Sequence, residues 1–137
     1  HRTIAGGARR CRFRQRLHGK NIARRIERAA RAAQQFRTER LPKFLDHFEQ
    51  AAGTNPGVWL IDDRWSYADT SLFQLVEGLR YMFPRRMAAL ERDYPGVVAI
   101  RDAVAALPGI SAYLASDRRV PFNTTGIFRH YPELDGD

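Results

Sequence analysis

One helix signal constrains the fold of this chain more than any other feature of its 137 residues. Ser66-Tyr67-Ala68-Asp69 has the S-x-x-D pattern of a capping box, in which the Ser66 hydroxyl accepts the Asp69 amide and the Asp69 carboxylate reaches back to the Ser66 amide. The apolar residues that follow cover more of the helix circumference than a narrow stripe, which predicts a helix in the centre of the domain. Pro84 ends this helix. Its apolar residues are Leu72, Phe73, Leu75, Val76, Leu79, Met82 and Phe83.

Other helical patterns flank this central helix. A helix should begin with Asn21 as its N-cap, and Pro42 then either kinks it or restarts it. Residues 1–20 are expected to be a loop or a frayed helix, and no segment shows a convincing strand pattern. The sequence therefore predicts an all-α fold, a bundle of about five or six helices around a long buried central helix. The later helices are expected around Met87 and Leu90, over Val97–Leu107 and over Ile110–Leu114.

Positive charge is concentrated near the N-terminal end. The net charge is +8, but residues 1–40 carry 13 Arg or Lys and two acidic residues, whereas residues 41–137 are mildly acidic. We therefore divide the chain into an Arg-rich, partly helical segment, 1–35, and a helical domain, 36–137, that ends in a C-terminal tail, 117–137. Arginine side chains neutralise phosphates, so this composition would also suit binding to nucleic acid. The Lys-poor bias of the segment would equally result from a shifted reading frame of a GC-rich coding sequence.

Several protein classes do not fit the sequence. The lone cysteine, Cys11, excludes an intrachain disulfide framework and a cysteine zinc cluster, and no histidine is placed to make it a catalytic thiol. No apolar run approaches the roughly 18 residues of a membrane span. The chain begins at His1 without a signal-peptide pattern, so we expect a cytoplasmic fragment or processed product with no membrane contact. No metal site is expected, because metal-ligand spacing is missing among the four histidines, His1, His18, His47 and His130.

Two groups of residues resemble the C-terminal domain of the glutathione S-transferase family. The segment Trp59–Asp69, WLIDDRWSYAD, is similar to the loop and capping box that open the core helix of that domain. Downstream, Tyr94–Val97 and Leu107–Leu114 are similar to the helices bounded by proline that follow the core helix. The resemblance covers residues 36–131. The family has Gly where this chain has Asp62, and Asp tolerates the left-handed backbone conformation served by such a glycine better than most residues do.

The resemblance implies a part in glutathione conjugation. In the family, a thioredoxin-like domain binds glutathione and stabilises its thiolate, which attacks an electrophile. This chain has no counterpart of that half, so it would supply the wall of the electrophile site and no catalytic or cofactor-binding residue. The implied partners are a thioredoxin-like glutathione-binding domain and, in a homodimer, a second copy. Glutathione would be the co-substrate of the full enzyme, and the isolated chain is expected to be inactive.

Two alternative functions remain open at this point. One is a non-catalytic, transferase-like module that binds other proteins. The other is an Arg-rich nucleic-acid-binding segment on a helical scaffold, although the segment contains no recognisable RNA-binding or DNA-binding module.

The candidate substrate-site residues lie in the tail and on the first helix. The resemblance implies that tail aromatics, here Phe122, Phe128 and Tyr131, can fold back toward the substrate pocket. The alternative is that they only pin the tail to the helices. Arg24 and Arg28 lie on a helix that would face the active-site cleft, and the alternative for them is a solvated face.

The residues around the capping box are interpreted as structural. Ser66 and Asp69 would cap the helix and take no part in catalysis, and Trp65 and Tyr67 are expected to pack beside the cap.

Overall fold

The computed structural model describes the backbone of residues 7–136 and the side chains of residues 21–136. The described residues form six α-helices and no strand, so the predicted all-α fold is confirmed. The helices are α1 (Gly7–Gln35), α2 (Leu41–Thr54), α3 (Tyr67–Met82), α4 (Pro84–Leu90), α5 (Pro95–Ala106) and α6 (Pro108–Leu114). Three helical turns lie between or after them, the π-helical turn Phe36–Arg40 and the 3-10 turns Glu91–Asp93 and Pro132–Leu134.

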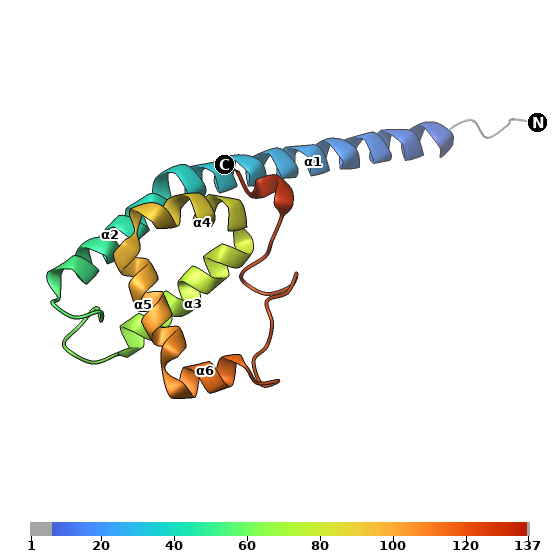
Figure 1. Cartoon of the computed structure of the whole chain (residues 1–137). Coiled ribbons are helices and arrows are strands. Elements are labelled where there is room, and N and C mark those ends of the chain that lie inside the picture. The colour runs from blue at the N-terminus through green and yellow to red at the C-terminus, as the bar shows by residue number, and fades with distance from the viewer. Residues whose placement is uncertain (1–6, 137) are drawn as a thin grey trace, which may run out of the picture.

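Helix α3 is the centre of the bundle, as its apolar circumference predicts. It packs along α5, which also packs against α2, while α4 follows the C-terminal end of α3 and α6 follows α5 (Figure 1). The side chains of Val76 in α3 and of Ile100 and Val104 in α5 are completely buried where the two helices meet. The remaining buried apolar side chains are Leu41, Leu45, Leu72, Phe73, Leu79, Phe83, Met87, Leu90, Tyr94 and Val97.

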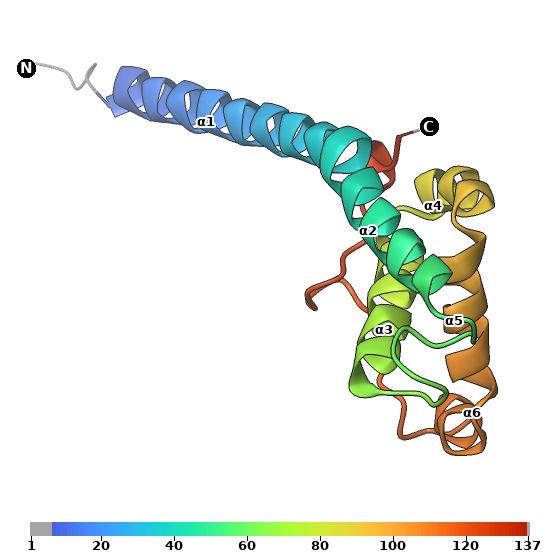
Figure 2. The same cartoon turned by 90° about the vertical axis from the view of Figure 1, so that its left-hand side faces the viewer.

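Helix α1 projects away from this bundle and joins α2 through the π-helical turn (Figure 2). Of the two alternatives expected for the first 20 residues, a loop or a frayed helix, the helix is found over residues 7–20. The expected N-cap is wrong, because Asn21 lies inside α1. Pro42 lies in the first turn of α2, and Arg40 and Leu41 before it keep helical backbone angles, so the helical path is kinked here and does not stop and restart. The wider π turn accounts for the bend between α1 and α2.

Two helices that begin with proline are capped by carboxylates from distant parts of the chain. Helix α4 has no capping side chain of its own, and Asp135 of the tail accepts the amides of Arg85 at 3.0 Å and Arg86 at 3.2 Å. Helix α5 likewise takes its cap from Glu49 of α2, whose two carboxylate oxygens accept the amides of Gly96 at 2.8 Å and Val97 at 2.9 Å. These contacts satisfy amides that a helix start otherwise leaves unpaired, and they fix α2 and the tail against the bundle.

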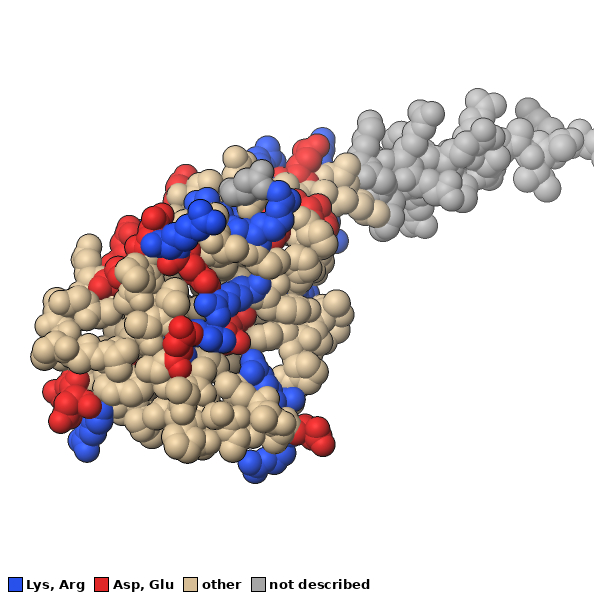
Figure 3. Space-filling model, in the orientation of Figure 1, with Lys and Arg blue, Asp and Glu red and all other residues tan. Residues whose placement is uncertain are grey.

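The surface of the bundle carries charges of both signs. Acidic and basic side chains are interspersed over the face seen in Figure 3. Within the described residues, no single helix is both long and apolar enough to cross a membrane, and only α5 and α6 together, bent by 82°, reach the required length and composition.

Candidate functional site

A cavity of about 440 Å³ lies where the end of α1, the end of α3 and the C-terminal tail meet. Its volume is within the range of about 300–1,000 Å³ that is usual for small-molecule sites. The wall is mostly apolar, and Arg129 is the one charged residue among the described residues that line it. The lining residues are Ala33, Phe36, Met82, Phe83, Gly126, Ile127, Arg129, Tyr131 and Leu134.

The tail is fastened beside this cavity by polar contacts on two sides. His130 Nδ1 lies 3.1 Å from the carbonyl oxygen of Met82, so this ring nitrogen must carry the hydrogen that it donates. The Arg37 guanidinium donates to the carbonyl oxygen of Leu134. Together with the Asp135 cap on α4, these bonds hold residues 130–135 between the π-helical turn Phe36–Arg40 and the α3–α4 corner.

Phe122 and Phe128 pack against α3 and do not line this cavity. The Phe122 ring stacks on Tyr81 with ring centroids 5.1 Å apart, and it meets Phe128 edge to face at 5.8 Å. The Phe128 ring covers Gly78, where the Cβ of any other residue would overlap it. A glycine at this buried position of α3 therefore makes room for the tail, and these two aromatics pin the tail to the helix.

Tyr131 is the tail aromatic that lines the cavity. Its side chain is 43% exposed, so one part of it contributes to the wall while another reaches solvent. Arg129 is held next to it by its own loop, since its guanidinium donates to the carbonyl oxygens of Gly126 at 2.7 Å and Thr125 at 3.2 Å.

Arg24 and Arg28 lie away from the cavity. They border a separate depression on α1 together with Asn21, Ile22 and Arg25. All residues from 21 to 32 are exposed, so both arginines are on a solvated stretch of helix. The structure therefore does not bring them together with Tyr131 or with the two phenylalanines.

Ser66 and Asp69 form the capping box that the sequence predicts. The Ser66 Oγ accepts the Ala68 amide at 3.2 Å, and Asp69 Oδ2 accepts the Ser66 amide and the Ser66 hydroxyl, each at 2.8 Å. The other oxygen of Asp69 accepts the amide of Leu60 at 2.8 Å, a contact to the preceding loop that the motif alone does not reveal.

The two aromatic residues beside the cap do not pack as expected. Tyr67 is 82% exposed and Trp65 is 53% exposed, so the expectation that they pack beside the cap is wrong. The loop before α3 is instead held by the hydrogen bonds that Asp69 accepts from the amides of Leu60 and Ser66.

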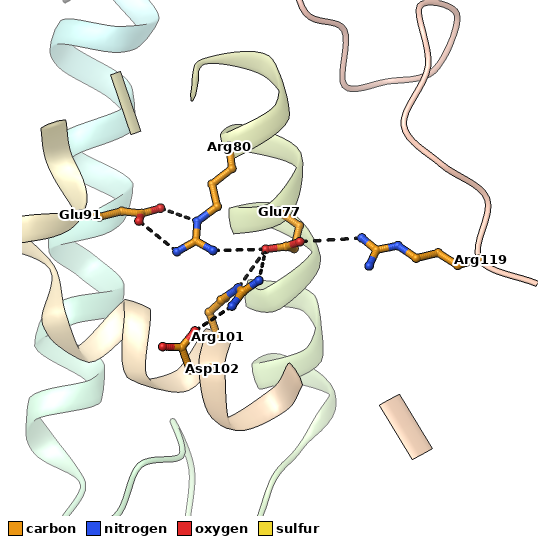
Figure 4. Close-up of polar contacts among 6 residues, drawn as sticks. All are labelled: Glu77, Arg80, Glu91, Arg101, Asp102 and Arg119. Carbon is orange, nitrogen blue, oxygen red and sulfur yellow. Dashed lines mark hydrogen bonds and ion pairs between the residues drawn. The ribbon is translucent and has the colours of Figure 1, made fainter. Parts of the chain in front are cut away.

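The sequence reasoning missed an ion-pair network that joins α3, the 3-10 turn Glu91–Asp93 and α5. Glu77 accepts Arg101 Nε at 2.9 Å and Arg101 Nη2 at 2.8 Å, while Arg80 forms a two-pronged pair with Glu91 at 2.6 and 2.9 Å (Figure 4). Arg101 also donates to Asp102 at 2.8 Å. Burial lowers the pKa of Arg101, but the hydrogen bonds to Asp102 and Glu77 outweigh it and raise this pKa above its ordinary value.

Several candidate residues lie outside the described side chains. Cys11, His1 and His18 are among them, so their environment is not defined. Between residues 21 and 136, His, Cys, Asp and Glu form no group of three that could hold a metal ion.

Comparison with known proteins identifies one family. The model of the family described as glutathione S-transferase, C-terminal domain, matches residues 20–117. No curated protein matches the chain significantly. The match begins inside the Arg-rich segment and spans the π turn and all the helices from α2 to α6.

Proposed function

Because the chain belongs to the glutathione S-transferase C-terminal domain family, we propose that it forms the helical, electrophile-binding half of an enzyme that conjugates glutathione. The observation that carries this proposal is the apolar cavity of about 440 Å³ beside the tail. An apolar electrophile needs a wall that replaces water around its body, and this cavity provides one.

The residues of the cavity take separate roles in this proposal. Met82, Phe83 and Tyr131 would surround the body of the electrophile, and Arg129 would face its electronegative substituents. The glutathione thiolate, activated on a thioredoxin-like domain, forms a bond to the electrophilic carbon, and a leaving group such as halide departs with the bonding electron pair. This chain then orients the electrophile and contributes no group that removes the thiol proton.

The first test separates the two binding roles. Isothermal titration of the purified chain with glutathione, with circular dichroism as the fold check, should give a helical spectrum and no binding. An NMR titration with 1-chloro-2,4-dinitrobenzene, without glutathione, should shift the amide signals of Met82 and Tyr131. Turnover of this substrate with glutathione by the chain alone, above the uncatalysed rate, would overturn the proposed division of roles.

A pair of tyrosine variants localises the electrophile. Tyr131→Ala should weaken binding of the dinitrobenzene several-fold, because it removes part of the cavity wall. Tyr67→Ala, which truncates a tyrosine that is 82% exposed and outside the cavity, should leave binding unchanged. Equal effects of the two variants would argue against the cavity.

The exposed stretch of α1 favours a second candidate, a non-catalytic module that binds another protein. Ile22 and Ile26, which lie one helical turn apart, are 46% and 60% exposed. A glutathione-independent complex that is lost on changing both isoleucines to serine would support this candidate. Salt-sensitive retardation of RNA that is lost on changing Arg24 and Arg28 to glutamine would support nucleic-acid binding instead.

A further inference from the structure

A second cavity, of about 420 Å³, lies between the N-terminal half of α3, helix α6 and the start of the tail. It shares no lining residue with the cavity beside Tyr131, and the proposed conjugation leaves it without a role. Its volume is again within the range of about 300–1,000 Å³ that is usual for small-molecule sites.

The inner wall of this second cavity is apolar. Phe73 and Val104 come from the α3–α5 core, Ile110 and Leu114 come from α6, and Phe122 closes the wall from the tail. Phe122 is itself fixed by its stack on Tyr81. The wall is therefore already formed, and a ligand with an apolar ring or chain would not need to order it.

Arg119 is the charged residue of this cavity, and within the described residues no acidic side chain lines it. Its guanidinium lies 3.8 Å from Glu77 Oε2, which is longer than a hydrogen bond. The other oxygen of Glu77 already accepts Arg101 (Figure 4). In the described part of the chain, Glu77 is the only side-chain partner of the Arg119 guanidinium. The N–H groups of this planar guanidinium, which form a donor fork, therefore remain available at the edge of an apolar cavity.

Three neutral polar side chains, those of Thr70, Gln74 and Tyr113, line the same cavity as this fork. The Gln74 side chain is exposed, lines the cavity and makes no hydrogen bond within the described residues. The Thr70 hydroxyl already donates its hydrogen to the carbonyl oxygen of Tyr67 at 3.0 Å, so it has no donor left for an anion. Gln74 can therefore offer an amide N–H to an anion that is already held by Arg119.

We propose that this cavity binds a small amphipathic carboxylate, with its apolar body against Ile110 and Phe122 and its carboxylate on Arg119. A guanidinium matches a carboxylate in a two-pronged, charge-assisted pair, and a low-dielectric wall strengthens such a pair. The ligand takes the place of the long contact to Glu77, which keeps its bonds to Arg101. The site depends on neither glutathione nor a second domain.

An NMR titration of the full chain with 1-naphthoate and with its neutral analogue 1-naphthamide tests the proposal. The two probes share the apolar body and differ in charge. The chain should bind naphthoate about tenfold more tightly than naphthamide, the difference expected for a hydrogen-bonded charge, with shifts centred on residues 104–122. Arg119→Gln should remove this preference, whereas Arg118→Gln, which changes an exposed neighbouring arginine, should keep it.

Two further variants place the probe. Gln74→Trp should fill the cavity from an exposed position and abolish binding of both probes. Arg129→Gln, in the first cavity, should change neither affinity. Equal loss of the naphthoate preference in Arg118→Gln and Arg119→Gln, or its loss in Arg129→Gln, would overturn the proposal. Arg119→Gln changes a partly exposed side chain, so we expect this variant to fold. Unchanged naphthoate binding by the folded variant would also overturn the proposal.

Discussion

The Asp69 carboxylate joins two segments of the chain at once. It is completely buried, and its oxygens accept hydrogen bonds from the Ser66 amide, the Ser66 hydroxyl and the Leu60 amide. The same group therefore caps α3 and holds the loop before it. A carboxylate is suited to this position because every partner is a donor.

Asp69→Asn should lower the free energy of unfolding by about 2–3 kcal/mol. The amide NH2 of asparagine would face at least one N–H or O–H donor and leave it unpaired in a buried site. Urea denaturation followed by circular dichroism measures the change. Asp63→Asn, in the exposed part of the same loop, serves as the control and should change stability by less than about 0.5 kcal/mol. Equal stability of the two variants would show that the buried hydrogen bonds are not needed.

Tyr94 gives the fold a dependence on alkaline pH. Burial, and then the hydrogen bond to Asp46 at 2.9 Å and its negative charge, raise the pKa of Tyr94 to about 12. The folded state therefore holds the phenol proton more tightly than the unfolded state, in which the pKa is about 10. This stabilisation is complete below pH 10 and is lost as the pH rises toward about 12.

Tyr94→Phe isolates this contribution. At pH 8 the variant should be less stable by about 1 kcal/mol, because it loses the hydrogen bond to Asp46. The difference from the wild type should shrink above pH 10, since only the wild type loses a folded-state advantage there. Denaturation curves at several pH values measure both the stability difference at pH 8 and its decrease above pH 10. A difference that stays constant up to pH 11.5 would contradict the pKa assignment.

At a single position, the sequence can predict the backbone conformation when few residue types tolerate that conformation. Asp62, which replaces the glycine of the resembling family, has a φ of 58°, the left-handed conformation that was expected for it. Asn55 accounts for part of this turn, since its side-chain amide donates to the carbonyl oxygens of Trp59 and Asp62. That side-chain contact could not be foreseen, because it depends on the path of the whole loop.

At the scale of elements, two of the three helices that begin with proline in the described part of the chain, α4 and α5, acquire their caps from distant segments. Both α4 and α5 start at a proline and lack a capping side chain at the preceding residue. Glu49 and Asp135 fill this role across 47 to 50 residues of sequence. The cap of such a helix therefore also fixes the position of the element that supplies it.

Glu49→Gln should lower the free energy of unfolding by about 1–2 kcal/mol. The glutamine oxygen can accept one of the two amides of Gly96 and Val97, but its NH2 group would face the other, and the charge at the helix N-terminus is lost. Chemical denaturation measures the loss. Asp117→Asn, an exposed carboxylate in the tail, is the matched control and should have little effect. A loss in Glu49→Gln that disappears in high salt would indicate a long-range charge effect in place of a cap.

The sequence predicts the later elements better than the first one. Helices α3 to α6 each have a local start signal, a capping box or a proline, and an apolar face that is buried in α3, α4 and α5 and partly buried in α6. Helix α1 has no comparable buried face at this end, since Ile22 and Ile26 repeat at helical spacing but remain exposed. Its start at Gly7 therefore could not be inferred from burial.

At the scale of the whole molecule, the C-terminal tail connects elements that are far apart in sequence. It contacts α3 through Phe122 and Phe128, the π-helical turn Phe36–Arg40 through Arg37, and α4 through Asp135. The same segment lines both cavities. The aromatic residues marked the tail as more than a solvated end, but which of them reach a cavity depends on how the tail crosses α3.

The residues of the candidate site were only partly predictable, because the path of the tail across α3 decides which side chains reach the cavity. Tyr131 lies in the wall of the first cavity, whereas Phe128 covers Gly78 and Arg24 and Arg28 lie elsewhere on α1. A glycine within a central helix was the available signal for a close approach by another segment. Arg129, which the sequence reasoning did not select, has no local pattern that marks it.

Asp135→Asn should release the last turn of the tail without unfolding the bundle. The amides of Arg85 and Arg86 lie in the first turn of α4, where no helical carbonyl is available to them, and Asp135 accepts both. Asparagine can accept only with its one oxygen, so hydrogen exchange of these two amides should speed up at least tenfold, while exchange of the buried Val76 amide should stay within twofold. Glu133→Gln, an exposed carboxylate two residues away, should leave all three rates unchanged. If Asp135→Asn accelerated Val76 as much as Arg85, the tail would be part of the global folding unit instead of a locally opening segment. If it accelerated none of them, the α4 cap would not depend on Asp135.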